Sequence, residues 1–460
     1  MVYLPIMINK IFKNRYFLFV VQFFTLSVFI ALIYGAIGIT TKDPDFAKIL
    51  RNTNIANLIV WSYWWPLIIV TAILFGRYWC SVCPMEMITS FFGNIGLRRK
   101  PNKLLKSGWV ITLFYAVILI IGIHTLAIHR IPQYMAIYMI LLFGIAVISG
   151  LIWEKRTFCT YICPIGHLLG LYSMLSFKKL RVINPSVCES CESKDCISKE
   201  NHYKFTGRSC TSELYPAKMK DNRSCLLCGQ CFKSCTKDNI AIQTRSFAAD
   251  IFKNIKLTWA ELSFFMMVSG FVIYEVLSEW KVSKAIIMKT PNWINHSLNI
   301  TGSLHGTIKA ITLFIIIPAV FFMTLALLKK LLAKETILNS FTQLVMAMLP
   351  ITASMHLLKA LLKTTSRIPY WDFVFTDPKG VNTAQALIEK SKTLDKGILL
   401  SISPYLSALA VLFSLGGIIL SLMVIHRQKF NNKTSKAISL FAALLYSGIF
   451  LIGIIAWRFF

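Results

Sequence analysis

The 460-residue chain is 56% hydrophobic and only 15% charged, and its mean hydropathy is +0.62. A soluble protein of this length needs more charged surface, so the composition favours an integral membrane protein. The net charge of +29 would suit a nucleic-acid partner, but the Lys and Arg residues gather beside long apolar stretches, as membrane topology requires. They do not form the basic, aromatic-interleaved stripe of nucleic-acid-binding proteins. We therefore expect membrane lipid, and no nucleic acid, as a partner.

The first predicted element is a retained membrane span. Lys10, Lys13 and Arg15 precede an apolar stretch over 16–39, a pattern that resembles the start of a signal peptide. The stretch is too long for the apolar region of a signal peptide, and no small-residue cleavage site follows it before Thr40.

Nine apolar stretches come close to the roughly 20 residues that a membrane helix requires. Between the fourth and the fifth lies one long polar segment, about 165–256, and the longest other connection is about 359–397. The predicted spans are 16–39, 57–76, 109–129, 135–153, 257–279, 308–328, 338–358, 398–425 and 436–457.

Positive charges beside the spans predict the side of the membrane that each loop occupies. With nine alternating spans, the N-terminal tail, the 165–256 segment, Arg98-Arg99 and Lys329-Lys330 all fall on one side. We expect that side to be the cytoplasm, which leaves the C-terminus outside.

An internal repeat is present within the first four spans. The second span leads into RYWCSVCP, from Arg77 to Pro84, and the fourth leads into RTFCTYICP, from Arg156 to Pro164. Each sequence has an arginine, an aromatic residue before the first cysteine, and a second cysteine followed by proline. The pattern predicts duplicated two-helix units that present matching cysteine pairs at one membrane face.

All 12 cysteines lie between Cys80 and Cys235, in segments predicted to face the cytoplasm. Because the cytoplasm keeps thiols reduced, metal or redox chemistry is favoured over disulfides. The clearest motif is Cys225-x₂-Cys228-x₂-Cys231-x₃-Cys235. At this spacing three thiolates hold one [4Fe–4S] cluster and the fourth ligates a neighbouring cluster. Thr236 stands where such a motif usually has proline.

A partner motif precedes it. Cys188-x₂-Cys191-x₄-Cys196 has two extra residues before its third cysteine, and Cys210 follows after thirteen more. Exchange of the fourth ligands then gives two clusters. The predicted ligands are Cys188, Cys191, Cys196 and Cys235 for the first, and Cys225, Cys228, Cys231 and Cys210 for the second. Zinc sites also use four cysteines, but they do not need this four-cysteine spacing.

The membrane-edge pairs, Cys80 with Cys83 and Cys159 with Cys163, leave several interpretations open. Four thiolates from two repeat units suit a third cluster or another metal. They also suit a dithiol relay, since a neighbouring arginine lowers the pKa of a thiol. Packing of small buried residues is the remaining alternative. We favour redox or metal chemistry without choosing between its forms.

These features predict a polytopic α-helical membrane protein of about nine spans with an inserted dicluster, ferredoxin-like α+β domain in the cytoplasm. The predicted parts are a four-span membrane domain over 1–164 with the duplicated units, a 2×[4Fe–4S] domain over 165–256, and a five-span membrane domain over 257–460.

Four histidines lie toward the predicted outer side, namely His124, His129, His305 and His356. Ionisable residues in or near spans are costly and mark candidate functional sites. Paired imidazoles could ligate haem b or shape a quinone or quinol pocket. Alternatively, each histidine is hydrogen-bonded at an interface, and the sequence leaves these interpretations open.

The repeated Arg-x-x-Cys-x₂₋₃-Cys-Pro pattern, followed by the two-cluster cysteine segment, resembles a family of bacterial membrane ferredoxins. Members include the quinol-dehydrogenase component of periplasmic nitrate reductase systems, the membrane flavoprotein serving nitrous oxide reductase, and the iron–sulfur protein of cytochrome oxidase assembly. The similarity covers about residues 57–240. It implies location in the bacterial cytoplasmic membrane, clusters at the eight ferredoxin cysteines, and electron exchange with quinol or a redox protein. We expect neither an immunoglobulin-like tail nor a flavin domain, and five spans follow that the resemblance does not explain.

The leading hypothesis is an electron-transfer protein that relays electrons between the quinone pool and a respiratory or maturation partner. Whether it is an enzyme, such as a quinol dehydrogenase subunit, stays open. The alternatives are a metal reductase or assembly factor, for example one acting on Cu(II), and a redox sensor. The sequence does not specify the redox partner, the direction of electron flow, or haem and flavin content.

Overall fold

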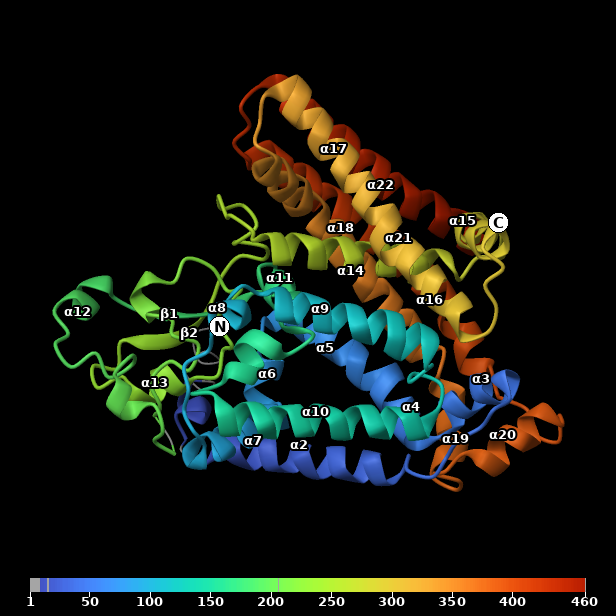
Figure 1. The fold of residues 1–460 in the computed structure, drawn as a ribbon, viewed down its shortest axis with the longest axis horizontal. Coiled ribbons are helices and arrows are strands. Elements are labelled where there is room, and N and C mark those ends of the chain that lie inside the picture. The colour runs from blue at the N-terminus through green and yellow to red at the C-terminus, as the bar shows by residue number, and fades with distance from the viewer. Residues whose placement is uncertain (1–8, 15, 206, 460) are drawn as a thin grey trace. The chain divides into compact units, whose positions relative to one another are not determined.

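Long apolar helices dominate the computed structural model of this protein, which describes residues 9–14, 16–205 and 207–459 (Figure 1). Eight of them have the length and composition to cross a membrane, whose hydrocarbon core is about 30 Å thick. This confirms a polytopic helical architecture. They are Phe17–Tyr34, Ile55–Phe75, Pro132–Ile152, Trp259–Leu277, Leu304–Ala333, Ile337–Val374, Gly397–Arg427 and Lys433–Trp457.

Some spans are single helices, and others are interrupted by π-helical turns. The single helices are α2 (Phe17–Tyr34), α10 (Pro132–Ile152), α14 (Trp259–Leu277), α21 (Gly397–Arg427) and α22 (Lys433–Phe459). The composite spans are α4 (Ile55–Leu58) with η1 (Ile59–Trp64) and α5 (Trp65–Phe75), α16 (Ser303–Ile311) with η6 (Thr312–Ile316) and α17 (Ile317–Ala333), and α18 (Ile337–Thr365) with η7 (Ile368–Tyr370) and α19 (Trp371–Val374). Here η1 and η6 are π-helical, and such turns often mark functional sites.

The predicted span 109–129 is shorter than expected. It consists of α9 (Trp109–Val117) and the π-helix η2 (Ile118–Thr125), and it falls below the length of the eight long helices. It ends in a turn in which Ala127 has a φ of +53°. The helix therefore stops before His129, so that residue lies in the connection and not in a span.

Many large apolar side chains of the long helices are exposed. Phe24 of α2 is 67% exposed and Ile452 of α22 is 68% exposed. Exposed apolar surface on this scale is rare in soluble proteins, and it is the surface that lipid tails cover. The observation supports membrane insertion.

Two connections that we predicted as loops contain helices. α15 (Lys281–Ser297) fills most of 280–307, and α20 (Val381–Ile388) lies within 359–397. α15 mixes lysines with apolar residues, so a search for continuous apolar stretches does not find it.

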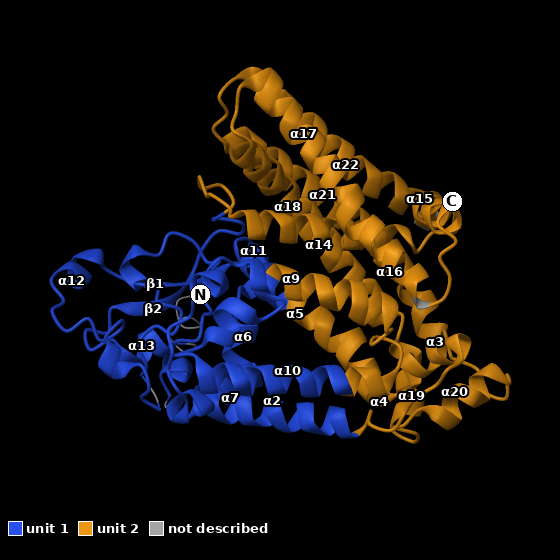
Figure 2. Ribbon diagram, viewed as in Figure 1, with its two compact units in different colours: residues 1–34, 70–111, 137–250 blue, residues 35–69, 112–136, 251–460 orange. Residues whose placement is uncertain are grey.

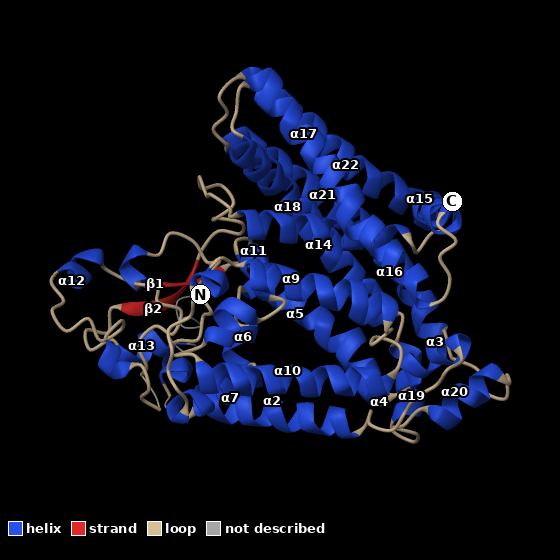
Figure 3. Cartoon of the chain, viewed as in Figure 1, coloured by secondary structure: helices blue, strands red, loops and turns tan. Residues whose placement is uncertain are grey.

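The polar segment 165–256 contains the two strands, drawn in red in Figure 3. β1 (Lys178–Val182) pairs antiparallel with β2 (Ile240–Thr244), and Leu180 lies opposite Ile242. Both of these side chains are buried. The remaining elements are short helices, α11 (Gly166–Ser173), α12 (Pro185–Glu189), η4 (Lys199–Asn201), η5 (Pro216–Lys218) and α13 (Gln230–Ser234).

The chain divides into two compact units, which Figure 2 colours blue and orange. Unit 1 comprises residues 1–34, 70–111 and 137–250, and unit 2 comprises 35–69, 112–136 and 251–460. Three further short helices are α3 (Pro44–Thr53) in unit 2 and α7 (Pro84–Ile95) and α8 (Lys103–Lys106) in unit 1. The predicted domain boundaries at 164 and 256 stay a prediction, and the start of the predicted cytoplasmic N-terminal tail lies outside the described residues.

Candidate functional site

The first cysteine pair lies at a junction between two helices of unit 1. Cys80 is part of α6 (Trp79–Val82), and Cys83 is the cap residue between α6 and α7. Pro84 is the first residue of α7, a position at which its missing N–H costs no helical hydrogen bond. The Cys-Pro step therefore ends one helix and begins the next, which places Cys83 at the junction.

The second pair has a different local structure. Cys159 lies in the π-helix η3 (Phe158–Ile162), and Cys163 caps the C-terminal end of that helix. A π-helical turn contains more residues than an α-helical turn. This matches the extra residue between Cys159 and Cys163, where the first unit has only two between its cysteines.

The four edge cysteines lie close enough to influence one another. Burial raises the pKa of the Cys163 thiol to about 12, and Cys80 adds to the shift. Burial also raises the pKa of Cys83, with contributions from Cys163 and Cys80 and an opposing hydrogen bond from the Met85 backbone. A reactive dithiol needs a lowered thiol pKa, whereas metal ligation deprotonates a thiol outright. Burial thus disfavours the free thiolate that a dithiol relay would need, and the choice between a metal site and a relay stays a prediction.

Among the described residues, no group of three or more His, Cys, Asp or Glu side chains is arranged to hold a metal ion. One cavity of unit 1 is nevertheless lined by all four cysteines that we assign to the first cluster, Cys188, Cys191, Cys196 and Cys235. Burial raises the pKa of Cys196 to about 12, and the other three cysteines add to the shift. Four thiols around one cavity fit the ligand set of a [4Fe–4S] cluster, and the assignment itself stays a prediction.

The second predicted set is more deeply buried. Cys225 and Cys231 belong to a hydrophobic cluster that includes Leu180 and Phe232. Burial raises the pKa of Cys231 well above its ordinary value, and its neighbours Cys210, Cys228 and Cys225 add to the shift. The predicted ligands of the second cluster therefore also lie near one another.

Local backbone structure brings Cys210 and Cys231 to this region. The backbone N–H of Cys210 donates to the carbonyl oxygen of Cys196 at 2.7 Å, so the thirteen intervening residues form a closed loop. Gly229, between Cys228 and Cys231, has a φ of +67°, a conformation that glycine adopts without a steric penalty. It begins α13, the helix that carries Cys231.

Hydrogen bonds reach the sulfur atoms of several predicted cluster ligands. The Leu214 N–H donates to Cys210 Sγ at 3.3 Å, and the Asn239 N–H donates to Cys235 Sγ at 3.4 Å. Asn239 Nδ2 also donates to Cys188 Sγ at 3.2 Å. Hydrogen bonds to ligand sulfur are one of the factors that set cluster potential, so Asn239 is positioned to influence the first predicted cluster through two of its ligands.

A buried ion-pair network lies beside the edge cysteines. Glu86 is 1% exposed and forms ion pairs with Arg156, also 1% exposed, and with Arg208 at 3.1 Å. Ser90 Oγ donates to Glu86 Oε1 at 2.9 Å, and Gln22 Nε2 donates to Glu86 Oε2. Burial alone would raise the pKa of Glu86, but the two arginines and these hydrogen bonds hold it below its ordinary value.

Arg156 also faces the cysteines. Its Nε and Nη1 atoms are buried and have no hydrogen-bond partner among the described residues. Burial alone would lower its pKa, but Glu86, Cys228 and Cys159 raise it. Arg156 therefore lies within electrostatic reach of one edge cysteine and one predicted ligand of the second cluster.

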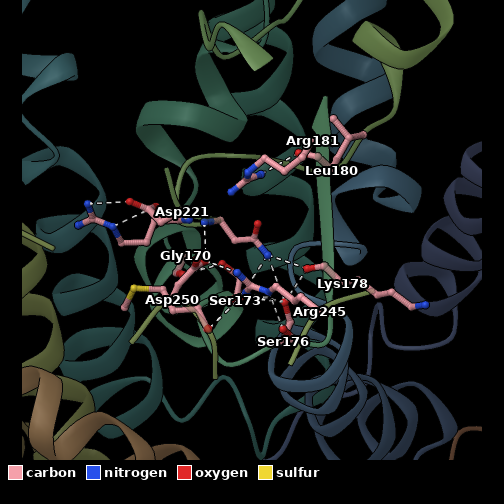
Figure 4. A network of polar contacts seen from close by, with 12 residues as sticks. Gly170, Ser173, Ser176, Lys178, Leu180, Arg181, Asp221, Arg245 and Asp250 are labelled. Carbon is pink, nitrogen blue, oxygen red and sulfur yellow. Dashed lines mark hydrogen bonds and ion pairs between the residues drawn. The ribbon is translucent and has the colours of Figure 1, made fainter. Parts of the chain in front are cut away.

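A second polar network supports the loop before Cys225 (Figure 4). Asp250 Oδ2 pairs with Arg245 at 2.5 Å and accepts a hydrogen bond from the Asn222 N–H at 2.9 Å. Asn222 Nδ2 donates to the carbonyl oxygen of Lys178 at 2.7 Å, and Arg245 donates to carbonyl oxygens at the end of α11. The loop is thus tied to both β1 and α11.

The four predicted histidines all lie in unit 2. His124, His129 and His356 have ring centroids 4.9, 6.3 and 6.1 Å from those of Phe314, Trp61 and Phe271. His305 lies in α16, and its carbonyl oxygen accepts a hydrogen bond from Asn295 at 3.4 Å. The haem or quinol role of these four histidines stays a prediction.

A model of a 4Fe–4S binding domain matches the chain twice, over residues 57–103 and 135–182. This match supports an iron–sulfur protein. The first range contains Cys80 and Cys83, the second contains Cys159 and Cys163, and both end before Cys188. The matched ranges thus coincide with the predicted duplicated units, while the predicted clusters at 188–235 are not tested by the match.

Two uncharacterized proteins of Methanocaldococcus jannaschii are similar to the chain. MJ0749 is 26% identical over 178 residues, which are 37% of this chain and 65% of that protein. MJ0750 is 25% identical over 244 residues, which are 49% of this chain and 91% of that protein. The similarity therefore spans just under two thirds of the first relative. No solved structure matches the chain.

The structure adds residues to the site that the sequence interpretation omitted. Gln22, Arg208 and Asp250 belong to none of the predicted motifs, although all three join the buried networks. A signal was available for Gln22, because it is the only amide or charged side chain in the Phe17–Tyr34 helix and polar residues in spans mark functional positions. Arg208 and Asp250 lie in loops, where no local pattern distinguishes them.

Proposed function

We propose that this chain is a membrane-bound iron–sulfur protein that relays electrons between the quinone pool and a respiratory or maturation partner. The observation that carries the proposal is the single cavity lined by Cys188, Cys191, Cys196 and Cys235. The 4Fe–4S domain match and the eight long apolar helices support it. Iron–sulfur clusters, when bound, take up and release single electrons at potentials that their surroundings set.

The chain's own residues contribute ligands, shielding and charge. In this proposal the ferredoxin-like domain binds two clusters through the eight cysteines between Cys188 and Cys235, and Cys80, Cys83, Cys159 and Cys163 bind a third centre. The hydrophobic cluster around Cys225 and Cys231 limits access of water. The positive charges of Arg156 and Arg208 stabilise added negative charge near Cys228.

The first test is purification without oxygen, followed by quantification of iron, sulfide, haem and flavin. At four irons per cluster, two clusters give about eight iron atoms per chain and three give about twelve. Colourless protein that contains zinc, or no metal, would contradict the proposal.

Single substitutions then assign the iron to its ligands. Cys196→Ser, Cys228→Ser and Cys163→Ser should each lower the iron content by about four atoms, if each cysteine serves a different cluster. Ser190→Ala is the matched control, because Ser190 is an exposed neighbour of Cys191 and should leave the iron content unchanged.

Electron exchange with quinol is tested separately. Added quinol should bleach the visible absorption of the anaerobically purified protein, because the clusters become reduced. Protein with full iron content that stays oxidised in excess quinol would refute the quinone role while leaving the iron–sulfur assignment intact.

A further inference from the structure

Unit 2 contains a group of positive side chains around the π-helix η1. Its members come from three parts of the chain, namely α3 (Arg51), the connection after η2 (Arg130) and the end of the Ile337–Val374 span (Lys363 and Arg367). They do not belong to the proposed electron-transfer site, so the inference is independent of that function.

Three contacts connect these segments to η1. Thr364 Oγ1, next to Lys363, donates to the carbonyl oxygen of Ser62 at 2.7 Å. The Trp61 ring lies 6.3 Å from the ring of His129, and His129 Nε2 accepts a hydrogen bond from Arg130 Nε at 3.1 Å. These contacts place Arg130 and the segment that carries Lys363 beside η1.

The charges influence one another. Burial, with smaller contributions from the positive charges of Arg367 and Arg130, lowers the pKa of Arg51 to about 10. Burial likewise holds the pKa of His129 well below its ordinary value, with Arg130, Lys363 and Arg51 contributing. Like charges this close oppose one another's ionised form, so the group is electrostatically unfavourable by itself.

Acidic side chains do not balance the group. Glu275 acts on Arg51 and Lys363, and Glu279 acts on Arg367. Lys359 pairs with both carboxylates, with Glu275 at 3.5 Å, so the two acidic residues face five cations. Among the described residues, no ion pair involves Arg51, Arg130, Lys363 or Arg367.

Hydrogen-bond donors of the same region also lack acceptors. Arg51 Nε, Arg367 Nε and Trp61 Nε1 are buried and have no partner among the described residues. Asn57 is 0% exposed, and neither its Nδ2 nor its Oδ1 atom has a hydrogen-bond partner among the described residues. Buried donors without partners cost free energy, and an acceptor bearing negative charge would satisfy them while neutralising the cations.

We infer that Arg51, Lys363 and Arg367, with Arg130 beside them, bind a phosphate group. Arginine side chains match this chemistry because the planar guanidinium donates two parallel hydrogen bonds to phosphate oxygens. The bound phosphate could come from two sources in a membrane, the headgroup of an anionic phospholipid or free inorganic phosphate.

The experiment uses the full chain, purified in a neutral detergent in chloride buffer. One arm titrates inorganic phosphate against chloride at matched ionic strength. The other transfers the protein into bilayers of phosphatidylcholine with or without phosphatidylglycerol, and each arm measures binding and the midpoint of thermal unfolding. We expect the midpoint of thermal unfolding to rise to a plateau in one of the two arms. The arm that shows this rise identifies the source of the bound phosphate.

Variants then locate the binding site. Arg51→Gln and Lys363→Gln should each weaken binding at least tenfold, whereas Lys363→Arg should retain it. Lys48→Gln is the matched control, since Lys48 is an exposed cation of the same helix as Arg51 and pairs with Asp45 at 2.6 Å. The Lys48→Gln variant should bind phosphate with the same affinity as the unmodified protein.

A stability readout separates binding from folding. In chloride alone, Arg51→Gln should unfold at the same temperature as the unmodified protein or higher, because the change removes repulsion. Equal affinity in the unmodified protein and Arg51→Gln, or no binding of phosphate or phosphatidylglycerol by the unmodified protein, would overturn the inference.

Discussion

At the scale of single residues, the buried charges depend on one another. Glu86 and Arg156 are each 1% exposed, and Arg208 completes the network from another loop. Removing one member of a buried ion pair leaves the others charged in a medium that solvates them poorly. The network is therefore sensitive to substitution even though none of its members is a predicted cluster ligand.

Glu86→Gln should lower the free energy of unfolding by about 3–5 kcal/mol, because it leaves two arginines without their carboxylate. Thermal or denaturant unfolding of the anaerobically purified protein measures this change. Glu213→Gln provides the control, since Glu213 pairs with Lys155 at 2.9 Å at a 40% exposed position, where ion pairs contribute about 1 kcal/mol or less. Equal losses in the two variants would contradict our account of the network.

Arg208→Gln should shift the potential of one cluster to a more negative value. Its positive charge interacts with Cys228 and favours the reduced, more negative state of a centre bound there. A loss of about 1.4 kcal/mol in that preference corresponds to about 59 mV for one electron. A redox titration followed by electron paramagnetic resonance measures the shift, and Lys199→Gln, an exposed lysine, should leave all potentials unchanged.

At the scale of elements, α7 and α10 approach each other through glycine. A Cβ atom at Gly150 of α10 would lie 2.8 Å from the carbonyl oxygen of Thr89 in α7, whereas one at Gly144 of the same helix would meet nothing within 4 Å. Small residues permit such close packing of membrane helices. Because α7 begins directly after Cys83 and α10 leads to Cys159, this contact helps to position both edge pairs.

Gly150→Ala should therefore destabilise unit 1 by about 1–3 kcal/mol, the usual cost of overpacking. Gly144→Ala should cause no loss, which makes it a matched control on the same helix. Retention of iron during heating compares the two variants. If both retain iron equally well, the α7–α10 contact is not what holds the edge cysteines in place.

The accuracy of the sequence prediction differs between the long apolar helices and the other helices. Apolar stretches predicted seven of the eight long helices to within about five residues, because span length is a local property. The predicted span 338–358 is too short, since the helical segment continues to Val374. The amphipathic α15 and the short α20 were missed, since their composition resembles that of surface loops.

At the scale of the whole molecule, the edge cysteines bear on the number of membrane crossings. Cys83 and Cys163 lie close enough to interact electrostatically, so we expect both pairs to lie on one side of the membrane. The chain between them must then cross an even number of times. If Pro132–Ile152 crosses once, as its length and composition allow, we expect Trp109–Thr125 to supply the second crossing despite its short length.

Nine crossings would place the two chain ends on opposite sides of the membrane. We expect a fluorescent protein to be active at the N-terminus and alkaline phosphatase to be active after residue 460, if the basic loops face the cytoplasm. Reporters fused after residue 100 and residue 240 should both show the cytoplasmic pattern. If the reporters instead place both chain ends on the same side of the membrane, Trp109–Thr125 does not cross it.

The sequence by itself determined the properties that depend on neighbouring residues. It predicted the apolar spans, the duplicated Cys-Pro units and the cysteine spacing typical of [4Fe–4S] ligands, because hydropathy, capping and ligand spacing are all local.

Only the tertiary structure decided which distant groups meet. It gathers Cys188, Cys191, Cys196 and Cys235 around one cavity, and it brings Glu86 to Arg156 and Arg208. It also brings Arg51 near Lys363 and Arg367. These meetings depend on how helices pack over long sequence separations, and no pattern of adjacent residues encodes them.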